Sequence, residues 1–519
     1  MFLVILVVCS ILAYFLTMYQ SRNLLGLGSD HAVHVFIVNQ IRRNNHKLFD
    51  KVPGIINDAY LGAYPLFMHV VLSYFSDKQI QIVTKHYNST VNGIFVFLGG
   101  TISMFLIEDM QWELMLGICL SLALCPQFFH VFSARNFGLS SRPVGILLVS
   151  ILVLLGYYYE TSIESSWFVV SGVLVGYLIW GSNTFAQQTI ILTGLFQGFI
   201  YSSWFLIFVF MISLATFIIF HNTYAISYIY RTTLFIYTYA TQMAKLYILK
   251  ERYSIWRDFI WDFYKNFDKN NLKISVKYVY RNPVIIIVFL NPFVLFSMLP
   301  ESFIAADTSF IVYSMRFSFC CFLVFIITSL RFSRFLGEPE RYVEMGTMFS
   351  AITSMFIVQQ ISGSLGIFVF VFYMALLYIV QVAMVEKVTS VIGGQQESIN
   401  MVQKAIIEKS LSEGDEINFY ANNEDVTKKL MVNDWNFARF WSFETKFAGY
   451  NFRDSYSQFP FYKERLTESV LDRYRVNYVV IDKRNPHSRP KNHALSNVES
   501  LMDNSDFSVY RLTWNPQPK

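Results

Sequence analysis

The chain has 519 residues, of which 54% are hydrophobic and 15% are charged, and its mean hydropathy is +0.39. Ordinary globular chains carry about a quarter charged residues, so this composition predicts an integral membrane protein. The formal net charge of +5 is small for the length, and Lys and Arg do not alternate with aromatic residues. We therefore expect the lipid bilayer as a partner and no nucleic acid.

The first apolar run, residues 1–19, is long enough to cross a hydrocarbon core of about 30 Å. It lacks a basic start and a cleavage site, so we expect an uncleaved span with the amino terminus in the cytoplasm. Further apolar runs recur as far as Val385, at 91–107, 114–132, 143–159, 166–181, 185–200, 201–220, 283–299, 309–329, 346–360 and 363–385. They predict about 11–13 transmembrane helices, and so a mainly α, polytopic helical membrane protein.

All five cysteines lie within apolar runs, at Cys9, Cys119, Cys125, Cys320 and Cys321. This placement predicts neither a disulfide framework nor a cysteine-based metal site.

The first polar segment, residues 20–90, follows directly after the first span. Within it, Ser29 and Asp30 are expected to open a helix that runs to Arg43, with Ser29 as the N-cap. Asp30 and His34 are one turn apart on that helix and share a face, with His31 beside them. In one interpretation, Asp30 only favours the helix dipole. In the other, the carboxylate and the imidazoles form a site that moves a proton or holds one side of a hard divalent cation.

The same segment ends at Tyr64, which is followed by Pro65 and by an apolar stretch to Phe75. That stretch is too short to span, so we expect a helix along the membrane interface. His69 within it is expected to be a packed residue rather than a ligand.

Arg135 and Arg142 form a second polar cluster, two spans after the first loop and hence on the same membrane face as Asp30. Arginines on the outer face depart from the positive-inside rule, and an anionic ligand such as a phosphate would explain them. The alternative is a pair of arginines that snorkel at a helix end.

A third cluster, residues 331–344, concentrates charge between two apolar runs and contains Glu338, Glu340, Arg341 and Tyr342. A guanidinium fork suits a phosphate or pyrophosphate, so Arg341 is a candidate for binding one. The alternative is a charged loop without a ligand.

The sequence becomes polar after Lys387. Expected strands lie at 416–420, 476–481 and 507–513, and expected helices near 399–411 and 461–473. We therefore divide the chain into a transmembrane domain, 1–387, and a small C-terminal extramembrane α/β domain, 388–519.

These features together resemble the polytopic glycosyltransferases of the GT-C fold, which include protein O-mannosyltransferases, oligosaccharyltransferases and lipid A aminoarabinose transferases. The resemblance rests on Asp30 in the sequence Gly28-Ser29-Asp30-His31, on Tyr64-Pro65-Leu66, on Glu340-Arg341-Tyr342 late in the membrane region, and on the α/β tail. It implies inverting transfer of a sugar from a polyprenyl-phosphate-linked donor to a protein, lipid or glycan acceptor on the outer, periplasmic or lumenal, face.

The resemblance also implies roles for individual residues. Asp30 would be the catalytic base, or would bind a divalent cation, Mg²⁺ or Mn²⁺, in metal-dependent members. Arg341, Arg142 and Arg135 would hold the donor phosphate. The remaining substrate contacts would come from His31, His34, Tyr64, Glu338, Glu340 and Tyr342.

Two other classes of function stay open. A multi-span transporter, or a flippase or polymerase of lipid-linked glycans, would be expected to bury ionisable groups in mid-span. Here the charges collect at helix ends, with few exceptions such as Arg316. A noncatalytic membrane scaffold with a binding tail is the third class.

Overall fold

The structure is a computed structural model of the chain. It describes residues 1–21, 29–48, 65–125, 138–162, 166–238, 292–301, 309–330, 333, 336, 339–421, 424–431, 433, 435–437, 471–472, 475–483 and 498–513.

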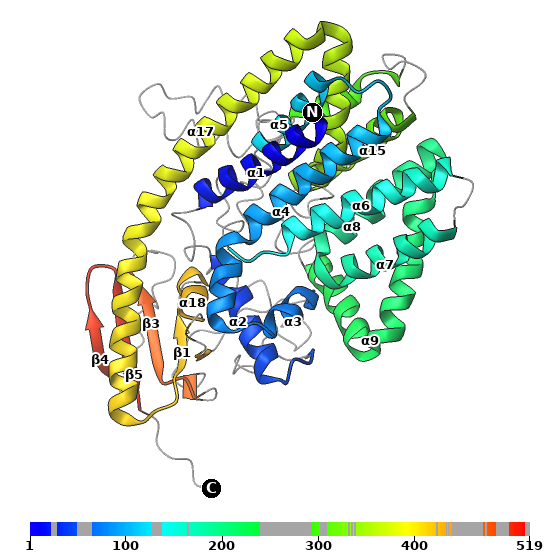
Figure 1. The fold of residues 1–519 in the computed structure, drawn as a ribbon. Coiled ribbons are helices and arrows are strands. Elements are labelled where there is room, and N and C mark those ends of the chain that lie inside the picture. Colours follow the sequence, from blue (N-terminus) through cyan, green and yellow to red (C-terminus); the bar gives the residue numbers. More distant parts are fainter. Residues whose placement is uncertain are drawn as a thin grey trace.

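A bundle of apolar helices makes up most of the described molecule (Figure 1). Its members are α1 (Phe2–Ser21), α4 (Asp77–Leu106), α5 (Trp112–Leu124), α6 (Arg142–Thr161), α7 (Ser166–Ser182), α8 (Thr184–Tyr201), α9 (Phe205–Thr238), the 3-10 helix η4 (Pro292–Met298), α15 (Ser309–Thr328) and the first part of α17 (Thr347–Glu413). Small residues let neighbouring helices approach closely. A Cβ atom on Gly100 of α4, for example, would lie 2.6 Å from Leu6 of α1 and 2.7 Å from Cys119 of α5.

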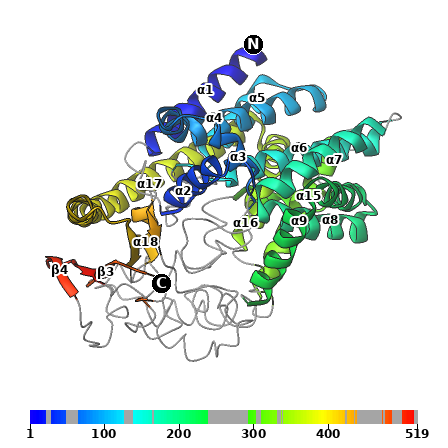
Figure 2. The same cartoon turned by 90° about the horizontal axis from the view of Figure 1, so that it is seen from below.

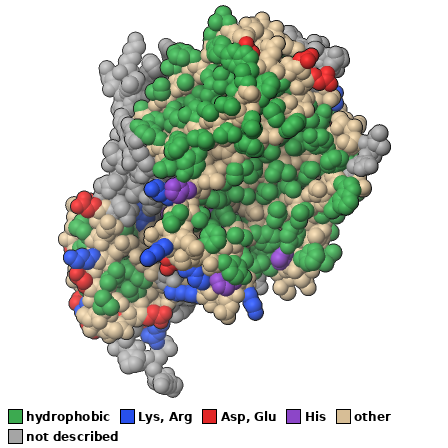
Figure 3. Space-filling model, in the orientation of Figure 1, with side chains coloured by type: hydrophobic (Ala, Val, Ile, Leu, Met, Phe, Trp, Pro, Cys, Tyr) green, Lys and Arg blue, Asp and Glu red, His purple; other side chains and the backbone are tan. Residues whose placement is uncertain are grey.

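Six helices of the described chain are long and apolar enough to cross a membrane: α1, α4, α6, α9, α15 and α17. Their outer faces carry large exposed apolar side chains such as Phe105, Phe208 and Leu365. Figure 3 shows this apolar face over the bundle, with charged side chains gathered mainly over the strands and along the lower edge. Apolar patches of this extent are unusual on soluble monomers.

Some of the predicted spans take a different form from the one expected. The runs at 114–132 and 166–181 form helices of only 13 and 17 residues. The runs at 346–360 and 363–385 form one helix, α17, which is broken at Gly363 by a backbone conformation of φ 60° and ψ −156° that glycine adopts readily. The chain turns back there, since Met355 before the break and Ile367 after it both lie beside Gly117 of α5.

Two short helices, α2 (Ser29–Arg43) and α3 (Phe67–Ser73), lie across one end of the bundle (Figures 1 and 2). The helix predicted from Ser29 to Arg43 is confirmed. A short apolar helix is also present after Pro65, and Arg42 of α2 holds this layer to the bundle by an ion pair of 2.7 Å with Asp77, the first residue of α4.

A five-stranded sheet follows the long helix α17. Its strands are β1 (Asn418–Ala421), β2 (Asn436–Phe437), β3 (Tyr478–Asp482), β4 (Val498–Asp503) and β5 (Phe507–Leu512), in the order β2-β1-β3-β5-β4, with α18 (Glu424–Met431) between β1 and β2. The first three strands in that order are parallel, and β5 is antiparallel to both of its neighbours. Strands are thus present in all three predicted ranges, whereas most of the helix predicted at 461–473 lies outside the described residues.

The sheet and α2 share one hydrophobic core. Val33, Phe36, Ile37 and Ile41, the apolar face of α2, pack with side chains of the sheet, α18 and the far part of α17. The helix that carries Asp30 in its first turn is therefore buried against the C-terminal sheet.

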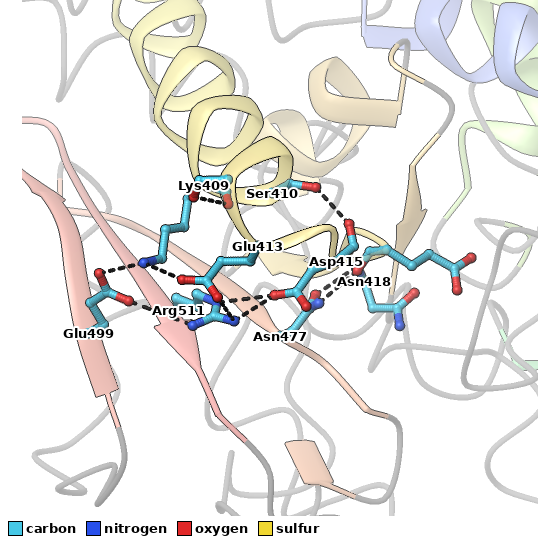
Figure 4. Close-up of polar contacts among 10 residues, drawn as sticks. Lys409, Ser410, Glu413, Asp415, Asn418, Asn477, Glu499 and Arg511 are labelled. Carbon is cyan, nitrogen blue, oxygen red and sulfur yellow. Dashed lines mark hydrogen bonds and ion pairs between the residues drawn. The ribbon is translucent and has the colours of Figure 1, made fainter.

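Charged residues fasten the end of α17 to the sheet (Figure 4). Arg511 of β5 lies 2.7 Å from Asp415, and Lys409 of α17 lies 2.9 Å from Glu413 and 3.0 Å from Glu499 of β4. The neighbouring cations hold the pKa of Glu413 below its ordinary value, mainly through its bond to Lys409. Such partly exposed pairs contribute little each, but together they fix the direction in which α17 meets the sheet.

The shared core yields a stability prediction. Phe36 is fully buried in it, so Phe36→Ala should destabilise the protein by about 3–5 kcal/mol. The change should also speed limited proteolysis within residues 388–519. Phe105→Ala in α4 is the control, because this side chain is 72% exposed on the apolar face. Equal effects of the two changes on melting and proteolysis would contradict a core shared by α2 and the sheet.

Candidate functional site

The first turn of α2 lies against the segment that leads into α6. The backbone N–H of Leu139 donates to Nδ1 of His31 at 3.3 Å. A Cβ atom on Gly138 would lie 2.8 Å from the His31 ring, and Gly138 has a φ of +106° that favours glycine. Burial in this contact lowers the pKa of His31 to about 4. The predicted first-loop cluster is thereby joined to the second predicted cluster, whose Arg142 lies three residues after Leu139.

His34 and His69 form a buried pair between α2 and α3. Nδ1 of His34 lies 2.8 Å from Nε2 of His69, and the rings stack with their centroids 5.0 Å apart. One of the two facing nitrogens donates and the other accepts, so the pair needs a single proton between them. Burial first, and then the neighbouring His34, hold the pKa of His69 well below its ordinary value of 6.5. The expectation that His69 is a packed residue is confirmed, since its side chain has no exposed surface.

The starts of α6 and α8 lie side by side. Asn183, the N-cap of α8, accepts from the N–H of Ala186 at 2.9 Å and donates to the carbonyl oxygen of Ser141 at 3.1 Å. Gly145 allows this approach, because a Cβ atom there would lie 2.8 Å from the Asn183 side chain. Two helix amino termini, each with positive dipole character, thus meet at one place.

Arg142 is the first residue of α6, where a cation is unfavourable to the helix dipole. Its Nε lies 3.2 Å from Oε2 of Glu344, and both side chains are buried. Glu344 belongs to α16 (Glu340–Met345), so this ion pair joins the second and third predicted clusters. Sequence reasoning placed Glu344 in the third cluster but assigned it no role. Its spacing of four from Glu340 was the available signal, since it puts both carboxylates on one face of a helix.

Arg341 lies over the first turn of α8. Its guanidinium carbon is 4.0 Å from the centroid of the Phe185 ring, and the side chain is buried. Stacking of this kind uses the face of the guanidinium and not its N–H groups. Glu340, the preceding residue, is also buried, with 2% of its surface exposed.

The hydroxyl of Tyr342 anchors α16 to α8. It lies 2.7 Å from the carbonyl oxygen of Leu336 and 3.1 Å from Oε1 of Gln188. Burial raises the pKa of this hydroxyl, so it stays protonated at neutral pH. Tyr342 is therefore a fully buried support for Arg341 and Glu344.

Several of the predicted site residues cannot be placed. Tyr64, Arg135 and Glu338 lie outside the described residues. Asp30 lies in the first turn of α2 next to His31, but its side chain is outside the described part. Within the described residues, no group of three or more His, Cys, Asp or Glu side chains is placed to hold a metal ion.

The geometry thus gathers the three predicted clusters at one end of the bundle. Arg142 faces Glu344 of α16, the short helix that also carries Glu340 and Arg341, and all four side chains are buried. Leu139, whose N–H contacts His31, is three residues from Arg142, which is at most about 11 Å of chain.

No protein-family model and no curated protein matches this chain.

The His34–His69 pair predicts a pH dependence. The unfolded chain takes up a proton on His69 below about pH 6.5, whereas the native site resists it, so stability should fall as the pH is lowered through that value and stay level above it. His69→Gln removes this titration. Melting at about pH 7.5 and about pH 5.5 should therefore show a smaller loss for the variant than for the parent. An equal loss in both proteins would contradict a protonation-sensitive pair.

The ion pair of Arg142 and Glu344 predicts how the stability of single and double variants will compare. Glu344→Leu alone leaves the buried Arg142 without its carboxylate and should cost about 3–5 kcal/mol. The double variant Arg142→Met/Glu344→Leu removes both charges and should regain most of that stability. Thermal unfolding of the purified protein in detergent measures both. A double variant no more stable than the single one would show that the two charges do not act as a pair.

Proposed function

We propose that the protein is an integral-membrane glycosyltransferase that transfers a sugar from a polyprenyl-phosphate-linked donor to an acceptor. The observation that carries this proposal is the set of buried charged residues Arg142, Arg341, Glu340 and Glu344, which the contact of Leu139 with His31 joins to the helix that carries Asp30. Four charged side chains at one end of an apolar bundle are costly unless they serve a ligand or a structural pairing.

Arg341 is the best candidate for the donor phosphate. Nε of Arg142 is already engaged by Glu344, so this arginine is better suited to positioning α16 and to adding positive potential. Arg341 stacks on Phe185, an arrangement compatible with a bidentate contact to a phosphate in the plane of the guanidinium. The adjoining amino termini of α6 and α8 would favour the same negative charge.

Asp30 is proposed as the catalytic base. A carboxylate in this role takes a proton from the acceptor hydroxyl as that oxygen attacks the anomeric carbon of the sugar and the lipid phosphate leaves. His31 would support the position of Asp30 through its contact with Leu139. A cation on Asp30, Mg²⁺ or Mn²⁺, would bind through carboxylate oxygen, but the described imidazoles are engaged elsewhere, and we assign no step to a metal.

The proposed topology places the amino terminus in the cytoplasm and residues 388–519 on the outer face, with α1 as a span. Its support is that α2, the start of α6, α16 and the sheet lie on one side of the bundle. An acceptor would reach this side from water, and the donor from the lipid.

The buried charges favour this function over transport. Within the described residues, the buried Lys, Arg, Asp and Glu side chains lie on α16, α18, β3 and the first residue of α6. None lies in the middle of the six apolar helices, where a transporter would be expected to hold them.

The decisive experiment is Asp30→Asn in the purified protein, assayed with a panel of polyprenyl-phosphate-linked sugars. Loss of a catalytic base should slow transfer by about 10²–10⁴, whereas loss of a helix-dipole contact should cost only about 0.3–1 kcal/mol of stability. Glu113→Gln is the matched control, since Glu113 is also an acidic residue in the first turn of a helix, α5, at the other end of the bundle. A folded Asp30→Asn protein with full transfer activity would refute the catalytic role.

A further inference from the structure

A buried group of amide and hydroxyl side chains lies between α1 and α4. Asn92 donates to Oγ1 of Thr17 at 2.7 Å, and Asn88, one turn earlier in α4, donates to the carbonyl oxygen of Gly138 at 3.0 Å. Thr84 continues the same face at a spacing of four. We call this group the amide cluster; its members are Thr17, Gln20, Thr84, Asn88, Ser89 and Asn92.

The register of α1 and α4 places Gln20 at the outer end of the amide cluster. A Cβ atom on Gly100 would meet Leu6 and one on Gly93 would meet Ser10, so the two helices run antiparallel. Gln20 is one turn beyond Thr17 and therefore lies toward Asn88 and the start of α4. This is the end of the bundle that carries α2.

Much of the hydrogen-bonding capacity of the amide cluster is unused. Gln20 is 2% exposed, yet neither its Nε2 nor its Oε1 has a hydrogen-bond partner among the residues that the structure describes. Within the same residues, Oγ of Ser89, Oγ1 of Thr84 and Oδ1 of Asn92 are also buried without one. Buried polar atoms in native proteins are nearly always paired, with protein, water or a ligand, so five such atoms on neighbouring segments of α1 and α4 point to something that binds there.

The chemistry of the amide cluster indicates an uncharged ligand. The buried Lys, Arg, Asp and Glu side chains of the described residues lie on other elements, and none is on α1 or α4. An ammonium or carboxylate group bound here would be buried without a counter-charge. Amides and hydroxyls together both donate and accept, which is the pattern that sugar hydroxyls require.

The amide cluster also adjoins the candidate site. Gly138, which accepts from Asn88, packs against the ring of His31, the neighbour of Asp30. Because the cluster lies between two helices of the apolar bundle, a ligand anchored in lipid would reach it more directly than one arriving from water.

We propose that the amide cluster binds the sugar of the lipid-linked donor, and that this sugar is an uncharged hexose rather than an amino sugar or a uronic acid. This inference rests on the proposed function. It adds the substrate class and the residues that select it, with Gln20 as the principal contact.

The test measures binding to the full chain in detergent, using bare polyprenyl phosphate and the same lipid phosphate linked to glucose, mannose or galactose. The parent protein should bind at least one of the three hexose lipids about 10-fold more tightly than the bare lipid, since each uncharged hydrogen bond contributes a factor of roughly 2 to 10. Gln20→Leu should remove most of this preference while leaving the affinity for bare lipid unchanged. Ser89→Ala, a smaller change, should reduce the preference in part.

Two controls separate recognition from folding. Gln20→Leu replaces unpaired buried polar atoms by a similar apolar shape, so its melting temperature should be unchanged or higher. Gln359→Leu alters a glutamine of α17 that pairs with Gln111 at the other end of the bundle, and it should keep the sugar preference.

The outcomes are distinguishable. Failure of bare polyprenyl phosphate to bind would overturn the proposed function and this inference with it. Binding of bare lipid with no preference for any of the hexoses would overturn the inference alone. A hexose preference that is retained in both Gln20→Leu and Ser89→Ala would also overturn the inference. Equal binding of the free hexose to the parent and to Gln20→Leu would do the same, because it would place sugar recognition elsewhere. If Gln20→Leu does not fold, Ser89→Ala decides the same question.

Discussion

The burial of α2 on two sides is the constraint on which the site depends. Its apolar face, which includes Phe36, completes the core of the C-terminal sheet. On its other side, His31 contacts Leu139 before α6, and His34 contacts His69 of α3. A helix of 15 residues is marginal by itself, so packing on both sides must supply its stability. The first-loop site can therefore be held in place only when the sheet and the bundle are both folded.

Electrostatics imposes a second constraint at the start of α6. Arginine there opposes the helix dipole, and its burial adds a desolvation cost that is tolerable only because Glu344 lies 3.2 Å away. The carboxylate comes from a helix of only 6 residues, α16, which is itself anchored to α8 by Tyr342 and Arg341. These contacts depend on one another, so the loss of one would destabilise the packing of α6, α16 and α8.

Local patterns in the sequence were sufficient to predict several elements. The spacing of Val33, Ile37 and Ile41 predicted α2 with the bounds that the structure has, and alternating or continuous apolar residues predicted strands in the ranges where β1, β3 and β5 form. The same patterns could not say what covers each face, because periodicity specifies that a face is apolar and not which partner it meets. The pairing of Arg142 with Glu344 joins residues about 200 positions apart, and no local rule connects them. The reversal of the chain at Gly363 could not be predicted for a related reason: a run of apolar residues has the same pattern whether the helix continues or the chain turns back.

Polar groups in this protein differ in how completely they are paired, and this difference separates a structural contact from a candidate binding site. Near the sheet, Arg511 and its acidic neighbours are matched and partly exposed, which suits a structural joint. In the amide cluster, Gln20 is buried and neither amide atom has a partner within the described part of the chain. Leucine at that position would fill similar space without the desolvation cost, so stability alone does not favour glutamine there. Sites where a residue lowers stability in this way are often functional, and here the amide cluster lies beside the helix that carries Asp30.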